Sequence, residues 1–286
     1  MQYINPYRLF NIDTISAEHL SEIKNQVDTR FAAYAPNEVV TYNGTKLLKA
    51  ELLRLVHEMK DSVVAAYHKK ISENHELYNF LEYGHLNYLL HRSEYLENPE
   101  LMSFVAPYFA HQYSETLVQS LKTQDKETLE MLARQSLPQV EGDNDIAYYQ
   151  TTAQYVDNTL TDLKALQEDS RLNFMSEREL ISHLPDKSIE LYNMLPEYFA
   201  EARNMIGQQA GVLAEALLHN YGRRDGATAM INQALKLKTG PELTLRLQEF
   251  KKMLKPGFPK VPMFILIAIG VIGLLFLMNW IEQNYF

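Results

Sequence analysis

The chain of 286 residues contains no cysteine, which excludes disulfide bonds, thiolate metal sites and a cysteine nucleophile. It also lacks three motifs that mark large enzyme classes: the phosphate loop G-x-x-x-x-G-K-[ST], the nucleophile elbow G-x-S-x-G and the zinc motif H-E-x-x-H. These absences favour a protein that is not an enzyme and that needs no cofactor.

Positive charge is scarce over most of the chain. Residues 1–245 hold 22 Lys and Arg against 34 Asp and Glu, a net charge of −12. Affinity for DNA or RNA is built from clustered Lys and Arg side chains that neutralise phosphates. We therefore expect no nucleic-acid partner.

Long hydrophobic runs are absent until residues 261–280, VPMFILIAIGVIGLLFLMNW, which carry no charge. A helix of twenty residues is about 30 Å long, which matches the hydrocarbon core of a bilayer. A buried helix of a soluble domain would show a polar face, whereas Met263 to Met278 is apolar all round. We expect a transmembrane anchor over residues 261–281 and a short tail over residues 282–286.

The flanks of this run predict its orientation. Cytoplasmic flanks of membrane helices are enriched in Lys and Arg, and interfacial positions are enriched in aromatic rings such as Trp280. Residues 255–260 contain proline and glycine, so we expect a stiff linker there. The N-terminal body is then cytoplasmic, in a single-pass protein of the bacterial inner membrane or an equivalent membrane. The basic residues before the run are Arg246, Lys251, Lys252, Lys255 and Lys260.

Helical periodicity of apolar residues runs through almost all of the remaining chain. The one strand-like stretch is NEVVTYNG, where Asn43-Gly44 can form a hairpin turn, but it is too short and solitary to support a sheet. The expected fold class is all-α: a helical bundle or irregular helical solenoid with one C-terminal transmembrane helix. Helices are predicted at about residues 16–34, 45–71, 76–95, 99–122, 125–134, 144–168, 176–183, 186–220, 224–236 and 241–254.

The N-terminal segment carries a family resemblance. NPYRLFNIDTISAEHLSEIKNQVDTRFAAYAPN resembles the start of a J domain, with a short first helix and a second helix that begins EIK and ends in a Tyr two residues before a Pro. LLRLVHEMKDSVVAAYHKKI is similar to the antiparallel third helix of that fold. The resemblance covers about residues 4–70, so residues 1–75 are assigned to a J-domain-like helical hairpin.

One departure from the family limits what the resemblance implies. In J domains the loop between the second and third helices carries His-Pro-Asp, which engages an ATPase chaperone and stimulates its ATP hydrolysis. This chain has Ala35-Pro36-Asn37 in that place, so only the proline is retained. The resemblance therefore implies a degenerate docking module in which ATPase stimulation is absent or much reduced.

The second part of the body, residues 76–254, is expected to be a helical-repeat-like or bundle domain. Its last part resembles a tetratricopeptide-type helix pair, in which small residues let two helices approach closely. No repetition with the same period is visible upstream. The residues that carry the resemblance are Ala214, Leu217, Tyr221, Gly222, Ala227 and Ala234.

Two local patterns leave alternatives open. Glu82 and His85 have the spacing by which a Glu and a His ligate one metal from a helix, but a di-metal bundle needs a second such pair, which is missing. Arg223 and Arg224 either bind an anion or belong to a turn between helices.

The function expected from these observations is a tail-anchored membrane adaptor or scaffold. Its cytoplasmic helical body would bind protein partners in a membrane-associated complex, for example in protein assembly or transport, and its C-terminal helix would contact lipid. Two alternatives are kept: an active J-type cochaperone at the membrane, and a metal-dependent helical-bundle enzyme.

Overall fold

The computed structural model describes residues 2–86 and 98–255. The expected transmembrane anchor (261–281), most of the linker (255–260) and the tail (282–286), with Lys260 and Trp280, lie outside the described residues. Within the described part, no helix is both long and apolar enough to span a bilayer. Of the described residues, 72% are in helices and 3% in strands, which confirms the all-α fold class.

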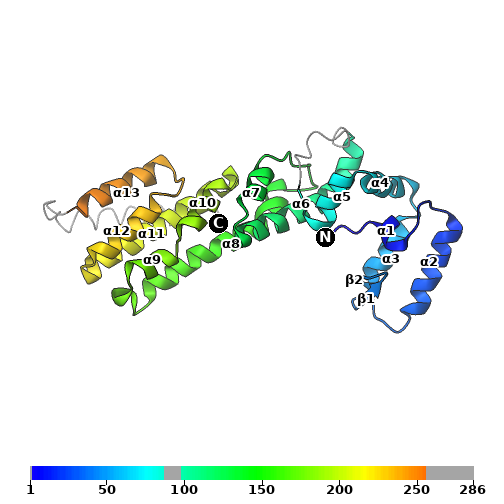
Figure 1. Ribbon diagram of the computed structural model, residues 1–286, viewed down its shortest axis with the longest axis horizontal. Helices are drawn as coiled ribbons and strands as arrows, with labels where there is room; N and C mark the ends of the chain where they lie inside the picture. The colour runs from blue at the N-terminus through cyan, green and yellow to red at the C-terminus, as the bar shows by residue number, and fades with distance from the viewer. Residues whose placement is uncertain (1, 87–97, 256–286) are drawn as a thin grey trace.

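An N-terminal module, defined as residues 2–73, lies at one end of an elongated molecule (Figure 1). Its small core is formed by apolar side chains between Leu9 and Ala65, among them the fully buried Val27 and Leu52. Its elements are α1 (Pro6–Phe10), α2 (Ala17–Arg30), β1 (Val39–Tyr42), β2 (Thr45–Leu48), α3 (Lys49–Glu58) and α4 (Ser62–Glu73).

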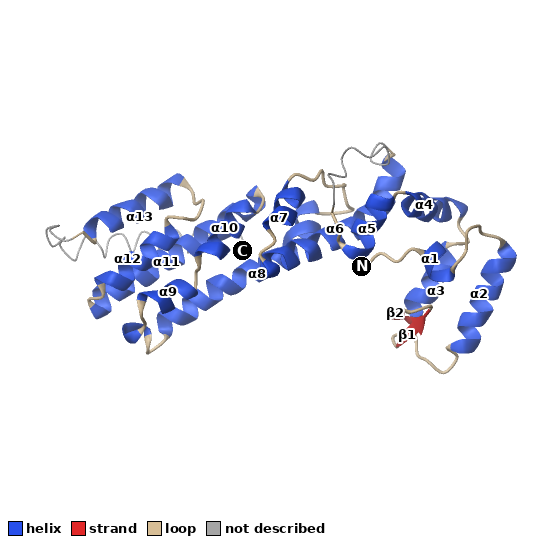
Figure 2. Ribbon diagram, in the orientation of Figure 1, coloured by secondary structure: helices blue, strands red, loops and turns tan. Residues whose placement is uncertain are grey.

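The strand-like stretch does form a sheet, so the expectation that it is too short to do so is wrong. β1 and β2 pair in antiparallel register around the turn at Asn43 and Gly44, which have φ of 46° and 85° (Figure 2). Positive φ at both positions is what a two-residue hairpin turn requires. The hairpin is stabilised by the burial of Val40, Tyr42 and Leu47 in the small core, which compensates for strands of only four residues.

The helix predicted over residues 45–71 is also divided. β2 takes its first residues, and the remainder breaks between α3 and α4. The break is fixed by Asp61, whose carboxylate accepts hydrogen bonds from the amides of Val63 at 2.8 Å and Val64 at 3.3 Å. An aspartate in this role satisfies amides that have no partner within the helix, so it starts a new helix.

Most helices of the second part of the body lie where the sequence pattern predicts them. It is built around one large core that begins with Tyr3 and Ile71 and continues to Leu254. α4 contributes to both cores, because Ala65 lies in the small one and Ile71 in the large one. Its helices are α5 (His75–Tyr83), α6 (Pro99–Thr123), α7 (Lys126–Ala133), α8 (Asn144–Glu168), α9 (Glu177–Ser182), α10 (Asp186–Met194), α11 (Ala200–Tyr221), α12 (Arg224–Ala234) and α13 (Pro241–Met253), with short 3-10 helices η3 (Leu172–Phe174) and η4 (Glu197–Phe199).

Two predicted helices end earlier than the sequence pattern suggested. The stretch 186–220 is divided at Leu195 and Pro196, because a proline favours an extended residue before it, and Leu195 has ψ of 149°. The helix predicted over 76–95 is interrupted after Tyr83, where α5 ends and Gly84 adopts a left-handed conformation with φ of 71°; residues 87–95 lie outside the described part.

An aromatic cluster occupies the middle of the large core. The ring centroids of Phe109 and Tyr148 are 6.3 Å apart, those of Tyr113 and Tyr148 5.4 Å, and those of Tyr149 and Phe199 5.5 Å. These rings come from α6, α8 and η4, so the cluster joins segments far apart in the sequence. Aromatic pairs in such arrangements stabilise a core by about 0.5–1.5 kcal/mol beyond the burial of their area.

Small residues are buried in the pair α11 and α12. Ala214, Ala227 and Ala234 are fully buried. A Cβ atom added to Gly226 would lie 2.9 Å from Cδ1 of Leu180, so a larger residue would require the Leu180 side chain to move.

The turn between α11 and α12 yields a first prediction. Gly222 has φ of 67°, and no neighbouring atom lies within 4 Å of the position that a Cβ atom would take. Glycine is therefore favoured here by the backbone conformation and not by a lack of space. We expect Gly222→Ala to lower the free energy of unfolding by about 1 kcal/mol. Urea denaturation measures this. Gly222→Asn is the matched variant, since asparagine tolerates the left-handed region, and an equal or larger loss with Asn would contradict this reason.

Candidate functional site

The loop that carries Ala35, Pro36 and Asn37 lies on the surface between α2 and β1. The amide of Ala35 donates to the Glu38 carboxylate at 2.6 Å, and the carbonyl of Pro36 accepts from the amide of Ala50 at 2.9 Å. Through the second contact the loop fixes the start of α3. All three side chains are exposed, and the position offers neither an imidazole nor a carboxylate to a partner.

Of the basic residues predicted to flank the anchor, four are described. Arg246, Lys251 and Lys252 are exposed on α13, and Lys255 is exposed just after its end. They therefore lie at the end of the molecule that is opposite the N-terminal module (Figure 1).

The structure does not bring Glu82 and His85 together on one helical face, because α5 ends at Tyr83 and His85 is exposed beyond Gly84. Among residues 2–86 and 98–255, no group of three His, Asp or Glu side chains is arranged to hold a metal ion.

Arg223 is the first of the two arginines considered as anion ligands. Its guanidinium already binds other groups of the protein. Its guanidinium donates to the carbonyls of Asn173 at 3.1 Å and Met175, and it pairs with Asp225 at 3.0 Å. This favours the interpretation as a turn between helices for Arg223, while Arg224 remains exposed.

A groove that the sequence did not predict lies between α2 and α4. It has a volume of about 650 Å³ and is open to solvent. Its floor is apolar: Leu20, Met59 and Ala65 are buried there, while Tyr7 and Ile15 are half-buried at its sides. A floor of this kind suits an apolar side chain of a bound segment, because binding removes both surfaces from water.

The rim of this α2–α4 groove is positively charged. Lys24, Lys60 and Lys69 line it, with Asp13 as the one acidic residue of the lining. The three lysines come from α2, from the turn before α4 and from α4. In a body with a net charge of −12 over residues 1–245, such a rim favours an acidic ligand.

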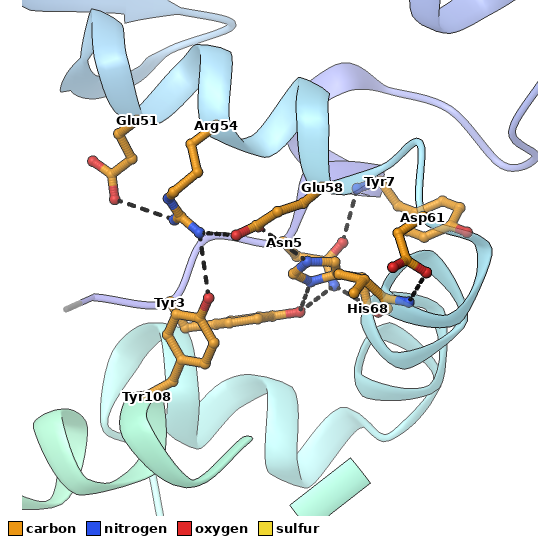
Figure 3. A network of polar contacts seen from close by, with 10 residues as sticks. Tyr3, Asn5, Tyr7, Glu51, Arg54, Glu58, Asp61, His68 and Tyr108 are labelled. Carbon is orange, nitrogen blue, oxygen red and sulfur yellow. Dashed lines mark hydrogen bonds and ion pairs between the residues drawn. The ribbon is translucent and has the colours of Figure 1, made fainter. Parts of the chain in front are cut away.

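A buried polar network joins α1 to α4 (Figure 3). The side chain of Asn5, only 1% exposed, accepts a hydrogen bond from the amide of Tyr7 at 3.0 Å and so begins α1. Its amide nitrogen donates to the carbonyl of His68 and to the Tyr3 hydroxyl, both at 3.0 Å. The Tyr3 hydroxyl also lies 3.1 Å from Nδ1 of His68. Tyr7 and Lys69, which follow Asn5 and His68 closely in the sequence, both line the groove, so this network holds two of its lining elements together.

The network continues from α4 to α3 and α6. Nε2 of His68 lies 3.7 Å from Oε2 of Glu58, and the other carboxylate oxygen of Glu58 binds Arg54. Arg54 in turn lies 3.5 Å from the hydroxyl of Tyr108, a residue of α6 in the large core. The partly buried contact between Arg54 and Tyr108 thus joins this network of the N-terminal module to α6.

Burial and charge act in opposite directions on the ionisable groups of the network. Burial by itself would raise the pKa of Glu58, but the neighbouring His68 and Arg54 side chains hold that pKa below its usual value. Burial raises the pKa of Tyr3 well above the usual value and raises that of Tyr108 as well. The two phenols are therefore neutral hydrogen-bonding groups, and the Glu58 carboxylate is ionised.

These contacts could not be found from the sequence because they join distant residues: Asn5 and His68 are 63 positions apart. One local signal was present. Asn5 followed by Pro6 is the usual start of a helix, with a capping side chain and a proline at the first helical position. The lysine rim gave no local signal, since each lysine stands on a different element.

Comparison of the chain with protein-family models, with curated proteins and with solved structures finds no match.

The network makes a pH-dependent prediction. Because the pKa of Glu58 is lower in the folded than in the unfolded chain, its contribution to stability is complete above the unfolded pKa and is lost as the pH falls through the folded pKa. We expect Glu58→Gln to lower the melting temperature at pH 7, and the difference from the wild type to shrink as the pH falls below about 4. Thermal melts followed by circular dichroism at several pH values measure this.

Glu130→Gln is the matched control for this series. Glu130 lies 4.0 Å from Arg134 in an exposed pair, which contributes little to stability. A difference between wild type and Glu58→Gln that stayed constant from pH 7 to pH 3 would contradict the assigned cause.

Proposed function

We propose that the protein is a membrane-tethered adaptor whose N-terminal module binds an acidic, partly apolar segment of a partner protein in the α2–α4 groove. The observation that carries this proposal is the groove itself, with an apolar floor of Leu20, Met59 and Ala65 inside a rim of three lysines. Apolar burial supplies affinity, and the charged rim selects the partner and speeds its association.

The expected anchor over residues 261–281 supports the same proposal. A tether raises the effective concentration of the module near partners in the same membrane, so a weak groove contact becomes sufficient for function. The likeness of residues 4–70 to a J domain agrees with a docking role. The absence of enzyme motifs from the sequence is consistent with an adaptor in a protein complex.

Charge reversal in the groove tests the proposal. We expect the triple variant Lys24→Glu, Lys60→Glu and Lys69→Glu to lose a partner that the full-length wild type retains in mild detergent. A photoreactive amino acid in place of Ala66, an exposed residue of the groove lining, should crosslink to an acidic segment of the same partner. Mass spectrometry identifies both.

The control variant carries Lys122→Glu, Lys164→Glu and Lys187→Glu. These replace exposed lysines of α6, α8 and α10 and change the net charge of the protein as much as the groove variant does. It should keep the partner. Equal loss in both triple variants, or a crosslinked segment that is basic, would contradict recognition by the groove.

The degenerate loop gives a separate prediction. Because Ala35 and Asn37 stand where an active J domain has His and Asp, we expect no stimulation of ATP hydrolysis by an Hsp70-type chaperone when the full-length protein is added in detergent. A J-domain protein with His-Pro-Asp serves as the positive control of a steady-state ATPase assay. Stimulation by this protein that is lost on Pro36→Ala would instead support the active cochaperone.

A further inference from the structure

The end of the body opposite the N-terminal module is formed by α9, α12 and α13 (Figure 1). Here the first turns of α12 and the last turn of α13 enclose a shallow groove of about 470 Å³ together with the start of α9. Leu254 is buried in it, whereas Arg224, Lys251 and Lys255 are exposed around it. The chain leaves the described body at this same end, just beyond α13.

This end is positively charged although the rest of the body is acidic. The three cations of the groove face two acidic residues, Glu177 and Asp225. Asp225 is already paired with Arg223 at 3.0 Å, so Glu177 is the one acid of the lining outside that pair. Lys252 adds a further exposed cation on α13. Residues 1–245 carry −12, so the charge is strongly separated along the chain.

The same end presents an aromatic ring to solvent. Phe174 in η3 is 82% exposed, the most exposed of the large hydrophobic side chains in the described part of the chain. Its position is fixed, because the carbonyls of its neighbours Asn173 and Met175 both accept hydrogen bonds from Arg223. The adjacent Leu172 is fully buried, which anchors η3 in the large core. The ring is therefore held outside the body by a rigid support.

Chain length restricts where this end lies. Seven residues, 254–260, separate α13 from the start of the expected anchor at residue 261, and even fully extended they span only about 25 Å. The end of the body is therefore kept close to the bilayer if the anchor spans it. Clustered cations are attracted to anionic headgroups, by about 1 kcal/mol for each Lys or Arg near the surface, and an aromatic ring enters the headgroup boundary favourably.

We propose that a membrane-facing surface, made of Phe174, Arg224, Lys251, Lys252 and Lys255, binds an anionic phospholipid bilayer, with the ring of Phe174 at the boundary between headgroups and acyl chains. This inference rests on the tether of the proposed function. It adds that the body is held in a defined orientation, with the acidic remainder and the α2–α4 groove directed away from the lipid.

The single tryptophan of the chain, Trp280, allows the tether and the surface to be tested separately. Full-length protein is reconstituted in vesicles of phosphatidylglycerol and phosphatidylcholine in equal parts, with the phosphatidylcholine brominated on its acyl chains to quench tryptophan at the membrane. In the wild type, quenching of Trp280 reports the anchor. The surface is probed by Phe174→Trp combined with Trp280→Phe. The control is Val63→Trp in the same background, at a 54% exposed position of the N-terminal module.

We expect the reporter at position 174 to lose emission to an extent comparable with Trp280 and the reporter at position 63 to lose none. Adding Arg224→Glu and Lys251→Glu, or using phosphatidylcholine alone, should restore most of the emission at position 174. Quenching of Trp280 without quenching at position 174 would contradict the proposed membrane-facing surface but agree with the proposed anchor. Failure to quench Trp280 would instead contradict the proposal that residues 261–281 anchor the protein in the membrane. Equal quenching at positions 174 and 63, or no dependence on lipid charge, would also overturn the proposed surface.

Discussion

Replacing Arg203 with methionine is expected to lower the free energy of unfolding by about 3–5 kcal/mol, the largest effect of any exchange considered for the body. Arg203 lies on α11 and is only 4% exposed. Its Nη1 lies within hydrogen-bond distance of the carbonyls of Tyr192, Leu195 and Pro196, at 3.2 to 3.4 Å. Its Nε donates to the carbonyl of Lys238 at 3.3 Å.

These contacts explain the size of the expected effect. The carbonyl of Tyr192 belongs to the last turn of α10, those of Leu195 and Pro196 to the connection between α10 and α11, and that of Lys238 to the connection between α12 and α13, so one side chain fixes two loops. Burial lowers the pKa of Arg203, with the nearby Glu197 opposing it, yet an arginine stays charged at neutral pH. Methionine keeps the apolar stem but leaves the buried carbonyls without donors, which costs more than the loss of packing.

Thermal unfolding of Arg203→Met measures the effect, and a fall of about 10 °C is expected for a domain of this size. Arg203→Lys is the control, because one ammonium cannot reach both loops and should recover part of the loss. A melting temperature within about 2 °C of the wild type for Arg203→Met would show that the loops are held by their own packing.

The second large effect is expected at Asn5. Asn5→Ala removes the cap of α1, which contributes about 1 kcal/mol, and removes the two buried hydrogen bonds from the Asn5 amide to the His68 carbonyl and the Tyr3 hydroxyl, which contribute about 0.5–1.5 kcal/mol each. The total loss in the free energy of unfolding is therefore about 2–4 kcal/mol. The variant should also weaken partner binding, because Asn5 joins α1, which supplies Tyr7 to the α2–α4 groove, to α4.

Asp61→Ala is the matched control for Asn5→Ala. Asp61 caps α4 through two backbone amides but is exposed and contacts no distant element through its side chain in the described structure. Its replacement should cost only about 1 kcal/mol. Urea denaturation compares the two variants, and equal losses would show that the buried contacts of Asn5 add nothing beyond capping.

The long helices could be predicted because their signals are local. α6 and α8 show apolar residues at helical spacing, and each begins with a capping side chain, Asn98 before Pro99 and Asp143 before Asn144. Their observed bounds differ from the predicted ones by no more than a residue. The pair α11 and α12 was recognisable for the same reason, since its alanines and glycines follow the helical period.

The breaks were harder to place because they depend on competition between neighbouring signals. Pro196 was visible in the sequence, but the apolar period continues on both sides of it and favoured one long helix. The hairpin turn at Asn43 and Gly44 was recognised, yet strands of four residues are stable here only because Tyr42 and Leu47 are buried against helices. That burial is a tertiary contact, which periodicity does not report.

The groove, the polar network and Arg203 lie beyond what the sequence could reveal. Each lysine of the rim looks like an ordinary surface residue until α2 and α4 are placed side by side. Arg203 has its partners at separations of 7 to 35 residues, so nothing near it in the sequence distinguishes it from an exposed arginine. Sites assembled from distant elements are specified by the fold, and a single sequence shows their parts separately.

The aromatic cluster of α6, α8 and η4 has an optical consequence. Rings held in a fixed, asymmetric environment give a near-ultraviolet circular dichroism signal that disappears when side-chain packing is lost, even where helix content remains. The single tryptophan, Trp280, lies outside the described body, so this signal from the body arises from tyrosine and phenylalanine, with Tyr113, Tyr148 and Tyr149 fully or almost fully buried. The ellipticity of these tyrosines therefore follows the melting of the large core with no label added, while tryptophan emission follows residues 256–286 independently.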